Sequence, residues 1–215
     1  MAGFELAISY LVANGIPYEF LGLIDADTVV EPRYFEKLLD EFNNDPKLGL
    51  ASGGLFFEKG RTFVLELGDR NSPRGTGRLW RKTCFFETDG YMVCDAPPDA
   101  ISNVKAKLLG YGAKQFRSIV ALQLRLTSSA EGIWAGYEKR GKAWYYLNAH
   151  PVLVMMNAIH FTARPSLHRG VAFFVGYLTA FVRRTAKIDD EEIRRYFWRD
   201  RPWELIAETF GKRGA

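Results

Sequence analysis

The sequence predicts an α/β fold, in which helices flank a mostly parallel sheet. Helical and strand-like apolar patterns alternate over residues 2–57, an order typical of parallel-sheet proteins. From residue 131 onward the apolar residues recur mainly with a helical period. The chain has 215 residues, 47% hydrophobic and 25% charged, as is usual for a globular protein. We therefore expect a core domain at residues 1–150 and an amphipathic helical extension at residues 151–215.

The front of the chain predicts two helices and two strands in alternation. Residues 2–14 carry apolar side chains at helical spacing, and residues 18–24 form a short apolar run that indicates a buried strand. Pro32 suits the first turn of the next helix, whose apolar face runs to Phe42. Residues 48–57 predict a second strand, interrupted by a pair of glycines.

The rest of the chain predicts a loop, one more strand and several helices. Residues 68–77 contain three glycines and a proline without an apolar run, which indicates a loop. A helix is expected at residues 100–109 and a strand at residues 115–126. Further helical patterns lie at residues 131–140, 152–161, 171–184 and 190–198.

Charge and cysteine content exclude several classes of protein. The net charge is −6 over residues 1–100, +8 over residues 101–182 and +2 over residues 183–215. The basic residues are scattered and no nucleic-acid-binding motif is present, so we expect no nucleic-acid partner. Cys84 and Cys94 form neither a zinc signature nor a disulfide framework, which favours a reducing compartment. The N-terminus has no pattern typical of a signal peptide.

An acidic pair follows the first predicted strand. Ligands of open α/β sheets bind beyond the carboxyl ends of the strands, which is where Asp25 and Asp27 lie. Residues two apart on extended chain face the same way, so both carboxylates could address one Mg²⁺ or Mn²⁺ ion. The alternative is structural: Asp25 starts a turn and Asp27 caps the helix that begins near Pro32.

The surrounding sequence resembles a known enzyme family. Residues 20–54, FLGLIDADTVVEPRYFEKLLDEFNNDPKLGLASGG, resemble the centre of family 2 glycosyltransferases of the GT-A fold. GTGRLWRKTCFFETDGY, at residues 75–91, is similar to the segment that lines the donor sugar in that family. PPDAISNVKAKLLGYGAKQF, at residues 97–116, is similar to the segment that holds the catalytic base of inverting members. The resemblance covers roughly residues 5–150.

The resemblance implies a role for each acidic residue. Asp25 should contact the nucleotide, and Asp27 should reach a Mn²⁺ or Mg²⁺ ion that bridges the donor diphosphate. Asp99 should be the general base that takes the proton from the acceptor hydroxyl. Asp99 also suits the N-cap of the helix that follows it, and Asp95 or Asp89 could be the base instead.

Other donor contacts are implied by the same resemblance. Gly75 and Thr76 lie in a loop whose backbone could approach the sugar closely, although a plain flexible loop would have the same composition. Arg78 and Arg81 could pair with the diphosphate, or they could be ordinary surface arginines. Many membrane-bound relatives carry a Gln-x-x-Arg-Trp motif that this chain lacks, and Arg125 could still face the site.

The sequence also departs from the family at its front. Complete members begin with a strand and an Asn-rich turn that bind the nucleobase, and here the first predicted strand starts at residue 18. We therefore expect a glycosyltransferase core that lacks its N-terminal nucleotide-binding strands, and the isolated chain could be inactive. The expected reaction is inverting transfer from a UDP- or GDP-sugar to a glycan or lipid-linked acceptor, as in polysaccharide biosynthesis.

Two other functions remain open. The chain could be a non-catalytic, membrane-associated remnant or partner subunit. It could also be a haloacid-dehalogenase-like phosphohydrolase, because LIDADTV matches the first motif of that class. Asp25 would then be the nucleophile and Asp27 the general acid/base.

Residues 150–184 are apolar, aromatic and flanked by arginines, and no stretch reaches the ~20 residues that a transmembrane helix needs. They suit helices at an anionic membrane surface, or alternatively helices packed as ordinary core. We expect a peripheral or monotopic protein at the cytoplasmic face of the cell membrane, or otherwise a cytoplasmic one.

Overall fold

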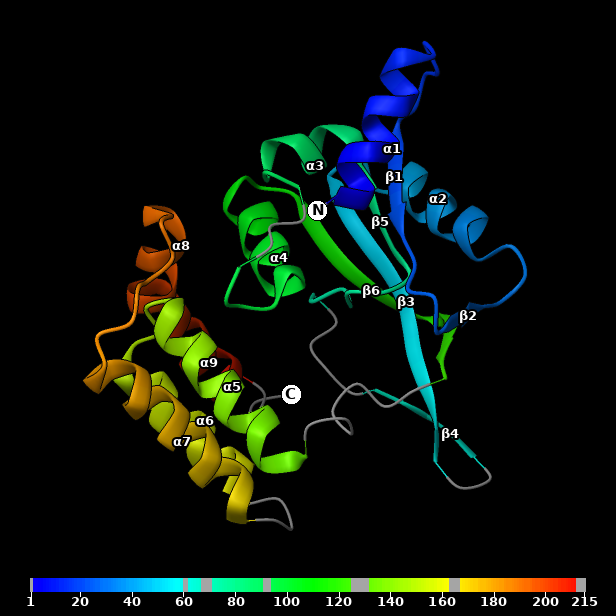
Figure 1. The fold of residues 1–215 in the computed structure, drawn as a ribbon. Helices are drawn as coiled ribbons and strands as arrows, with labels where there is room; N and C mark the ends of the chain where they lie inside the picture. The colour runs from blue at the N-terminus through cyan, green and yellow to red at the C-terminus, as the bar shows by residue number, and fades with distance from the viewer. Residues whose placement is uncertain are drawn as a thin grey trace. The chain divides into compact units, whose positions relative to one another are not determined.

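A computed structural model describes residues 2–59, 62–66, 71–90, 94–124, 132–162 and 167–211 (Figure 1). By its internal contacts the chain forms two compact units. Unit 1 comprises residues 1–93 and 98–126, and unit 2 comprises residues 94–97 and 127–215. The boundary near residue 126 lies earlier than the expected boundary at residue 150, because the helix that follows belongs to unit 2 by its contacts.

The described residues of unit 1 contain one mixed sheet. Its strands are β1 (Phe20–Leu23), β2 (Thr28–Val30), β3 (Leu48–Lys59), β4 (Thr62–Leu65), β5 (Arg78–Arg81) and β6 (Gly112–Gln123). The order is β1-β5-β3-β6-β2, and β4 pairs with β3. Only β3 and β6 are parallel; the other four described pairings are antiparallel. The α/β class is therefore confirmed, but the sheet is mixed rather than mostly parallel.

The difference comes mainly from two short strands, β2 and β5, that carry no sequence signal. β2 and β5 contain three and four residues, too few for a two-residue period to show. β5 also begins and ends with an arginine, which hides a strand whose first three residues are all buried. Both strands run antiparallel to their neighbours, so without them the antiparallel pairings of β1 and β6 could not be seen in the sequence.

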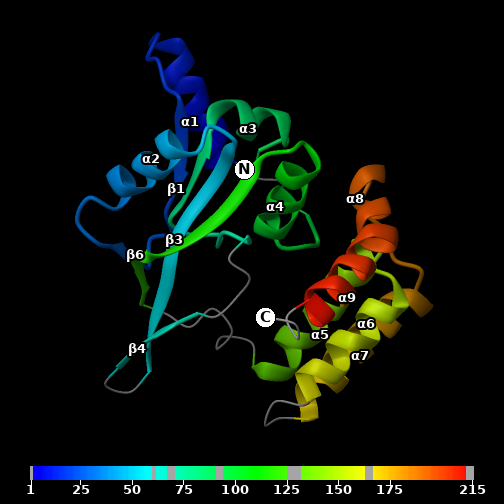
Figure 2. The same ribbon diagram turned by 180° about the vertical axis from the view of Figure 1, so that it is seen from behind.

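Helices cover both faces of this sheet (Figures 1 and 2). On one face α2 (Tyr34–Asn44) buries Tyr34, Leu38 and Phe42 in a core with β3, β5 and β6. On the other face lie α1 (Ala2–Ala13), α3 (Lys82–Glu87) and α4 (Pro98–Leu108), around a core that contains Trp80 and Phe85. Adjacent strand residues alternate between the two cores, as the pleat requires.

Unit 2 is helical. Its helices are α5 (Ile133–Tyr146), α6 (Pro151–Thr162), α7 (Leu167–Val182), α8 (Glu191–Arg195) and α9 (Arg201–Gly211), with a π-helical turn η1 (Tyr196–Asp200) between the last two. α7 packs against α5 and α6, with Phe161 and Phe173 in the core between them. The helical character expected for residues 151–215 is confirmed in the described part of that range.

Among the described residues, no helix is both long enough and apolar enough to cross a membrane.

Candidate functional site

The acidic pair lies on a tight turn between β1 and β2. The backbone N–H of Thr28 donates to the carbonyl oxygen of Asp25 at 3.0 Å, which closes a four-residue turn. Asp25 is exposed and Asp27 is partly buried. The turn therefore presents two carboxylates to solvent just beyond the end of β1, at the position expected from the sequence.

Thr76 holds this turn from a distant part of the chain. Its hydroxyl oxygen accepts the backbone N–H of Asp25 at 3.0 Å and donates to the hydroxyl of Thr28 at 2.9 Å. Thr76 and Thr28 are both buried. The structure thus brings the Gly75-Thr76 segment against the acidic turn, two motifs that the sequence could place together only through a family resemblance.

Tyr34 fixes the same loop from the other side. Its hydroxyl donates to the carbonyl of Gly77 at 2.6 Å and accepts the backbone N–H of Gly53 at 2.6 Å. Burial of the ring raises the pKa of Tyr34 to about 12, so this hydroxyl keeps its proton at neutral pH. Gly77 has a φ of 63°, and a Cβ there would lie 2.5 Å from the Tyr34 oxygen, so a side chain is excluded.

Arg78 lies at the same end of the sheet but is fully buried. Its Nε donates to the carbonyl of Arg74 at 2.8 Å, and its Nη2 donates to the Asn103 side chain at 3.0 Å and to the carbonyl of Pro73. Longer contacts of 3.4 and 3.5 Å reach the carbonyl of Asp99. The expected diphosphate contact is therefore corrected: this guanidinium is enclosed and instead ties the loop to the start of α4.

Asp99 lies inside the first turn of α4 and not at its cap, because the helix begins at Pro98. The side chain is partly buried. Asn103 on the next turn donates to Ser72 at 3.0 Å and to Pro73 at 3.2 Å, so the first half of α4 is bonded to the loop that carries Thr76. The expected base is thus held on an ordered helix beside that loop.

The other acidic candidates have different surroundings. Asp89 forms an ion pair with Lys105 at 2.5 Å, which occupies its carboxylate. Asp95 belongs to unit 2, whereas Asp99 belongs to unit 1. Arg125 lies outside the described residues. Within unit 1, the structure therefore favours Asp99 over Asp89 as a free carboxylate beside the loop.

Arg81 lies at the opposite end of β1 from the acidic turn. It pairs with Phe20, the first residue of β1, whereas Asp25 follows the last residue of that strand. At ~3.3 Å per strand residue, the length of β1 alone separates them by about 10 Å. Arg81 donates to the carbonyls of Leu48 and Phe42 at 3.3 and 3.1 Å. Arg81 therefore has structural hydrogen bonds away from the acidic turn, and its expected diphosphate contact stays a prediction.

The donor set of the turn suits a hard divalent cation. Mg²⁺ and Mn²⁺ bind carboxylate oxygen and retain positions for water and phosphate oxygens. Asp25 and Asp27 supply two exposed or partly exposed carboxylates of that kind. Among the described residues, no cluster of three or more His, Cys, Asp or Glu side chains could hold a metal ion.

An open apolar hollow of about 390 Å³ lies beside the turn, where β1 meets α2. Its lining includes Ile24, the residue before Asp25, and Phe35 on α2. No charged side chain lines it. The hollow itself is therefore apolar in its described lining, and the nearest carboxylates in sequence are those of the acidic turn.

Sequence reasoning missed Tyr34 and Asn103 as residues that shape this site. Tyr34 looked like one apolar member of a helix face, and Asn103 had no feature that set it apart. Their hydrogen bonds join segments far apart in the chain, and no local pattern reports such bonds.

Comparison with known proteins assigns no family to the chain: no protein-family model matches the sequence, and no curated protein matches it.

Proposed function

We propose that this chain is a metal-dependent glycosyltransferase core that transfers a sugar from a nucleotide-sugar donor to an acceptor hydroxyl, with inversion. The observation that carries the proposal is the pair of hydrogen bonds at the Thr76 hydroxyl, which accepts the backbone N–H of Asp25 and donates to the hydroxyl of Thr28. They join the two segments to which the family resemblance assigns the nucleotide and the donor sugar. The hydrogen bonds of Arg78 then tie the same loop to α4, which carries Asp99.

The proposed roles follow from exposure and position. Asp27 and Asp25 hold the cation and the nucleotide, because theirs are the carboxylates at the turn beyond β1. When bound, the divalent ion neutralises the charge that develops on the leaving diphosphate. Asp99 accepts the acceptor's hydroxyl proton while that oxygen bonds to the anomeric carbon and the bond to the diphosphate breaks. Thr76 positions the turn and does not itself react.

The first experiment measures nucleotide binding by calorimetry with UDP and GDP, with and without Mn²⁺. We expect Mn²⁺-dependent binding that Asp27→Ala abolishes. Asp40→Ala is the matched control, because Asp40 is an exposed carboxylate on α2, away from the turn. Equal Mn²⁺-dependent binding by Asp27→Ala and Asp40→Ala would refute the metal assignment.

The second experiment separates binding from chemistry. We expect Asp99→Asn to keep nucleotide affinity and to lose sugar transfer by about 10²–10⁴-fold, because a general base is needed only in the chemical step. Full transfer by Asp99→Asn would exclude Asp99 as the base. Nucleotide binding without transfer by the unaltered chain would favour the non-catalytic alternative, and Mg²⁺-dependent release of phosphate from an aryl phosphate would favour the phosphohydrolase.

A further inference from the structure

Helix α7 distributes its side chains in the opposite way to a helix of a water-soluble protein. Its inward positions carry Gly170, Ala172, Gly176 and Ala180, and Phe173 is the large apolar side chain buried there. Its outward positions carry large apolar side chains, with exposed fractions between 37% and 71%: Val171, Phe174, Val175, Leu178, Phe181 and Val182. We call these six residues the α7 stripe.

The α7 stripe is continuous along the helix. At about 100° per residue, its six positions fall within an arc of ~120°, and the inward positions fall on the other side. The stripe therefore runs from the second turn of α7 to its last residue. A partner that covers it must be apolar along roughly 16 Å, at about 1.5 Å per residue.

Backbone packing explains why the inward face carries small residues. A Cβ on Gly176 would lie 2.0 Å from the carbonyl oxygen of Glu138, and one on Gly141 would lie 1.9 Å from that of Phe173. A Cβ on Gly170 would lie 2.2 Å from the carbonyl oxygen of Ala158. α7 thus touches α5 and α6 almost backbone to backbone at these glycines, and apart from Phe173 its large apolar side chains lie on the outer arc.

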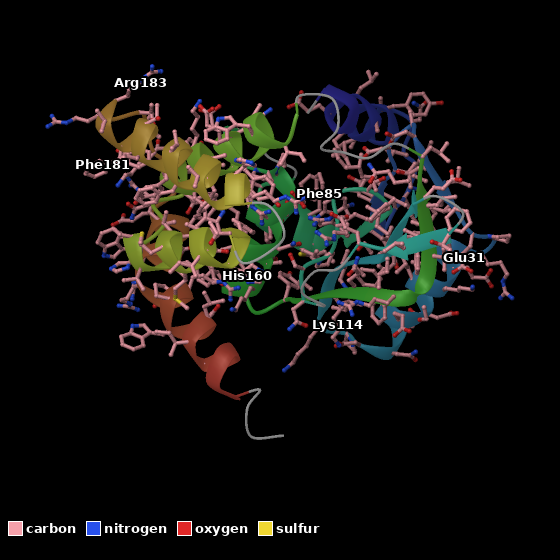
Figure 3. All side chains as sticks on the ribbon, turned by 90° about the horizontal axis from the view of Figure 1, so that it is seen from below. Glu31, Phe85, Lys114, His160, Phe181 and Arg183 are labelled. Carbon is pink, nitrogen blue, oxygen red and sulfur yellow. The ribbon has the colours of Figure 1, made fainter. Side chains whose placement is uncertain are left out.

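Cations predominate around the α7 stripe, although Glu138 on α5, which pairs with Lys142, also attracts Arg183. Residues 151–188 contain five Lys and Arg residues and no Asp or Glu. Arg183 and Arg184 follow the end of the stripe directly, and both are exposed. Figure 3 shows Phe181 and Arg183 projecting from the same end of α7. An apolar stripe that ends at two exposed arginines is complementary to a layer that is apolar inside and anionic at its surface.

We propose that α7 lies in the plane of an anionic lipid surface, with the α7 stripe inserted among the acyl chains and Arg183 and Arg184 beside lipid phosphates. Only one arc of the helix is available for this, since the other arc is packed on α5 and α6. The proposal concerns unit 2 alone, so it holds or fails independently of sugar transfer.

The test is co-sedimentation of the full chain with vesicles of phosphatidylcholine alone, or with 30% phosphatidylserine. We expect binding that is tighter with phosphatidylserine. Leu178→Glu should weaken vesicle binding about tenfold or more, because a leucine inserted among the acyl chains is replaced by a charged side chain. Leu109→Glu is the matched control, since Leu109 in unit 1 has a similar exposed fraction (48% against 46%) and undergoes the same chemical change.

A second variant tests the charge. Arg183→Gln should weaken binding to the phosphatidylserine vesicles about fivefold and leave binding to phosphatidylcholine unchanged. Circular dichroism of each variant checks that unit 2 keeps its helices. The proposal is overturned if the unaltered chain stays in the supernatant with both vesicles, or if Leu178→Glu binds like Leu109→Glu. It is also overturned if the stripe is covered by a second copy, shown by a dimer in gel filtration that Leu178→Glu dissociates.

Discussion

Replacing Tyr34 with phenylalanine tests how the loop around Thr76 is held. The change removes one oxygen atom and leaves the ring packing intact. It deprives two backbone groups of their partner: the N–H of Gly53 and the carbonyl of Gly77, each 2.6 Å from the hydroxyl. Both lie beside a fully buried ring that water does not reach. The cost should therefore come from unsatisfied hydrogen bonding and not from lost packing.

The size of the effect follows from the two bonds. An intramolecular hydrogen bond contributes a net ~0.5–1.5 kcal/mol, and a buried group left unsatisfied costs ~1–3 kcal/mol. We expect the free energy of unfolding of unit 1 to fall by about 2–3 kcal/mol for Tyr34→Phe. Tyr10→Phe is the matched control, because Tyr10 is 62% exposed, and we expect it to change the same free energy by less than ~0.5 kcal/mol.

The assay must report on unit 1 alone, and Cys84 provides the probe. Cys84 is fully buried in the core that contains Trp80, so its thiol reacts with a labelling reagent only when unit 1 opens. In a Cys94→Ser background, labelling across a urea gradient gives the unfolding midpoint. We expect Tyr34→Phe to lower that midpoint by about 1 M urea. A midpoint equal to that of Tyr10→Phe would refute the view that this hydroxyl anchors the loop.

Three further predictions use the same probe or thermal melting. Burial raises the pKa of Cys84 from 9.0 to about 12 and that of Tyr34 from 10.0 to about 12. Above pH 9 these groups lose their protons more readily in the unfolded chain than in the folded one. The free energy of unfolding of unit 1 should therefore keep its full value below pH 9 and fall as the pH rises toward 12; a flat profile would contradict this. Thr76→Val should cost about 1–2 kcal/mol more than Thr76→Ser, which keeps the hydroxyl. In α5, Gly141→Ala should lower the melting temperature and Gly136→Ala should not, because only a Cβ at Gly141 would meet the backbone of α7. Equal shifts for the two variants would contradict the close packing of α5 on α7.

The helices could be predicted because their apolar side chains repeat at helical spacing over several turns. The apolar face of α2 is confirmed by the burial of Tyr34, Leu38 and Phe42. The segments at 2–14, 100–109, 152–161 and 171–184 are confirmed as α1, α4, α6 and α7 with small shifts of their ends. In these segments one side chain in three or four faces the core, and this repeats often enough to be seen in the sequence.

The mixed sheet could not be predicted in the same way. β5 is defined by its pairing with β1 and β3, and only the fold reveals that Arg78 lies inside it. A buried arginine breaks the polar-outside rule, and it is tolerated because its donors meet carbonyls and the Asn103 side chain. No local pattern identifies a residue whose partners are distant in the chain.

The acidic residues of the candidate site could be predicted from the sequence, but the residues that hold the acidic turn and its neighbouring loop in place could not. Asp25 and Asp27 stood out because they follow an apolar strand, and the turn is confirmed by the bond between Thr28 and Asp25. Arg78 and Arg81 were selected by the resemblance and by their charge, which cannot separate a ligand contact from a structural hydrogen bond. Burial sets Arg78 apart and position along β5 sets Arg81 apart, and both come only from the fold.

The acidic turn also determines when the site can form during folding. Residues 24–27 connect β1 to β2, which stand at opposite ends of the strand order. β1 must find β5 and β2 must find β6, and both partners come much later in the chain. Pairings between distant segments form slowly because long loops must close first. The acidic turn therefore reaches its final position against the rest of the sheet only when both edges of the sheet are complete.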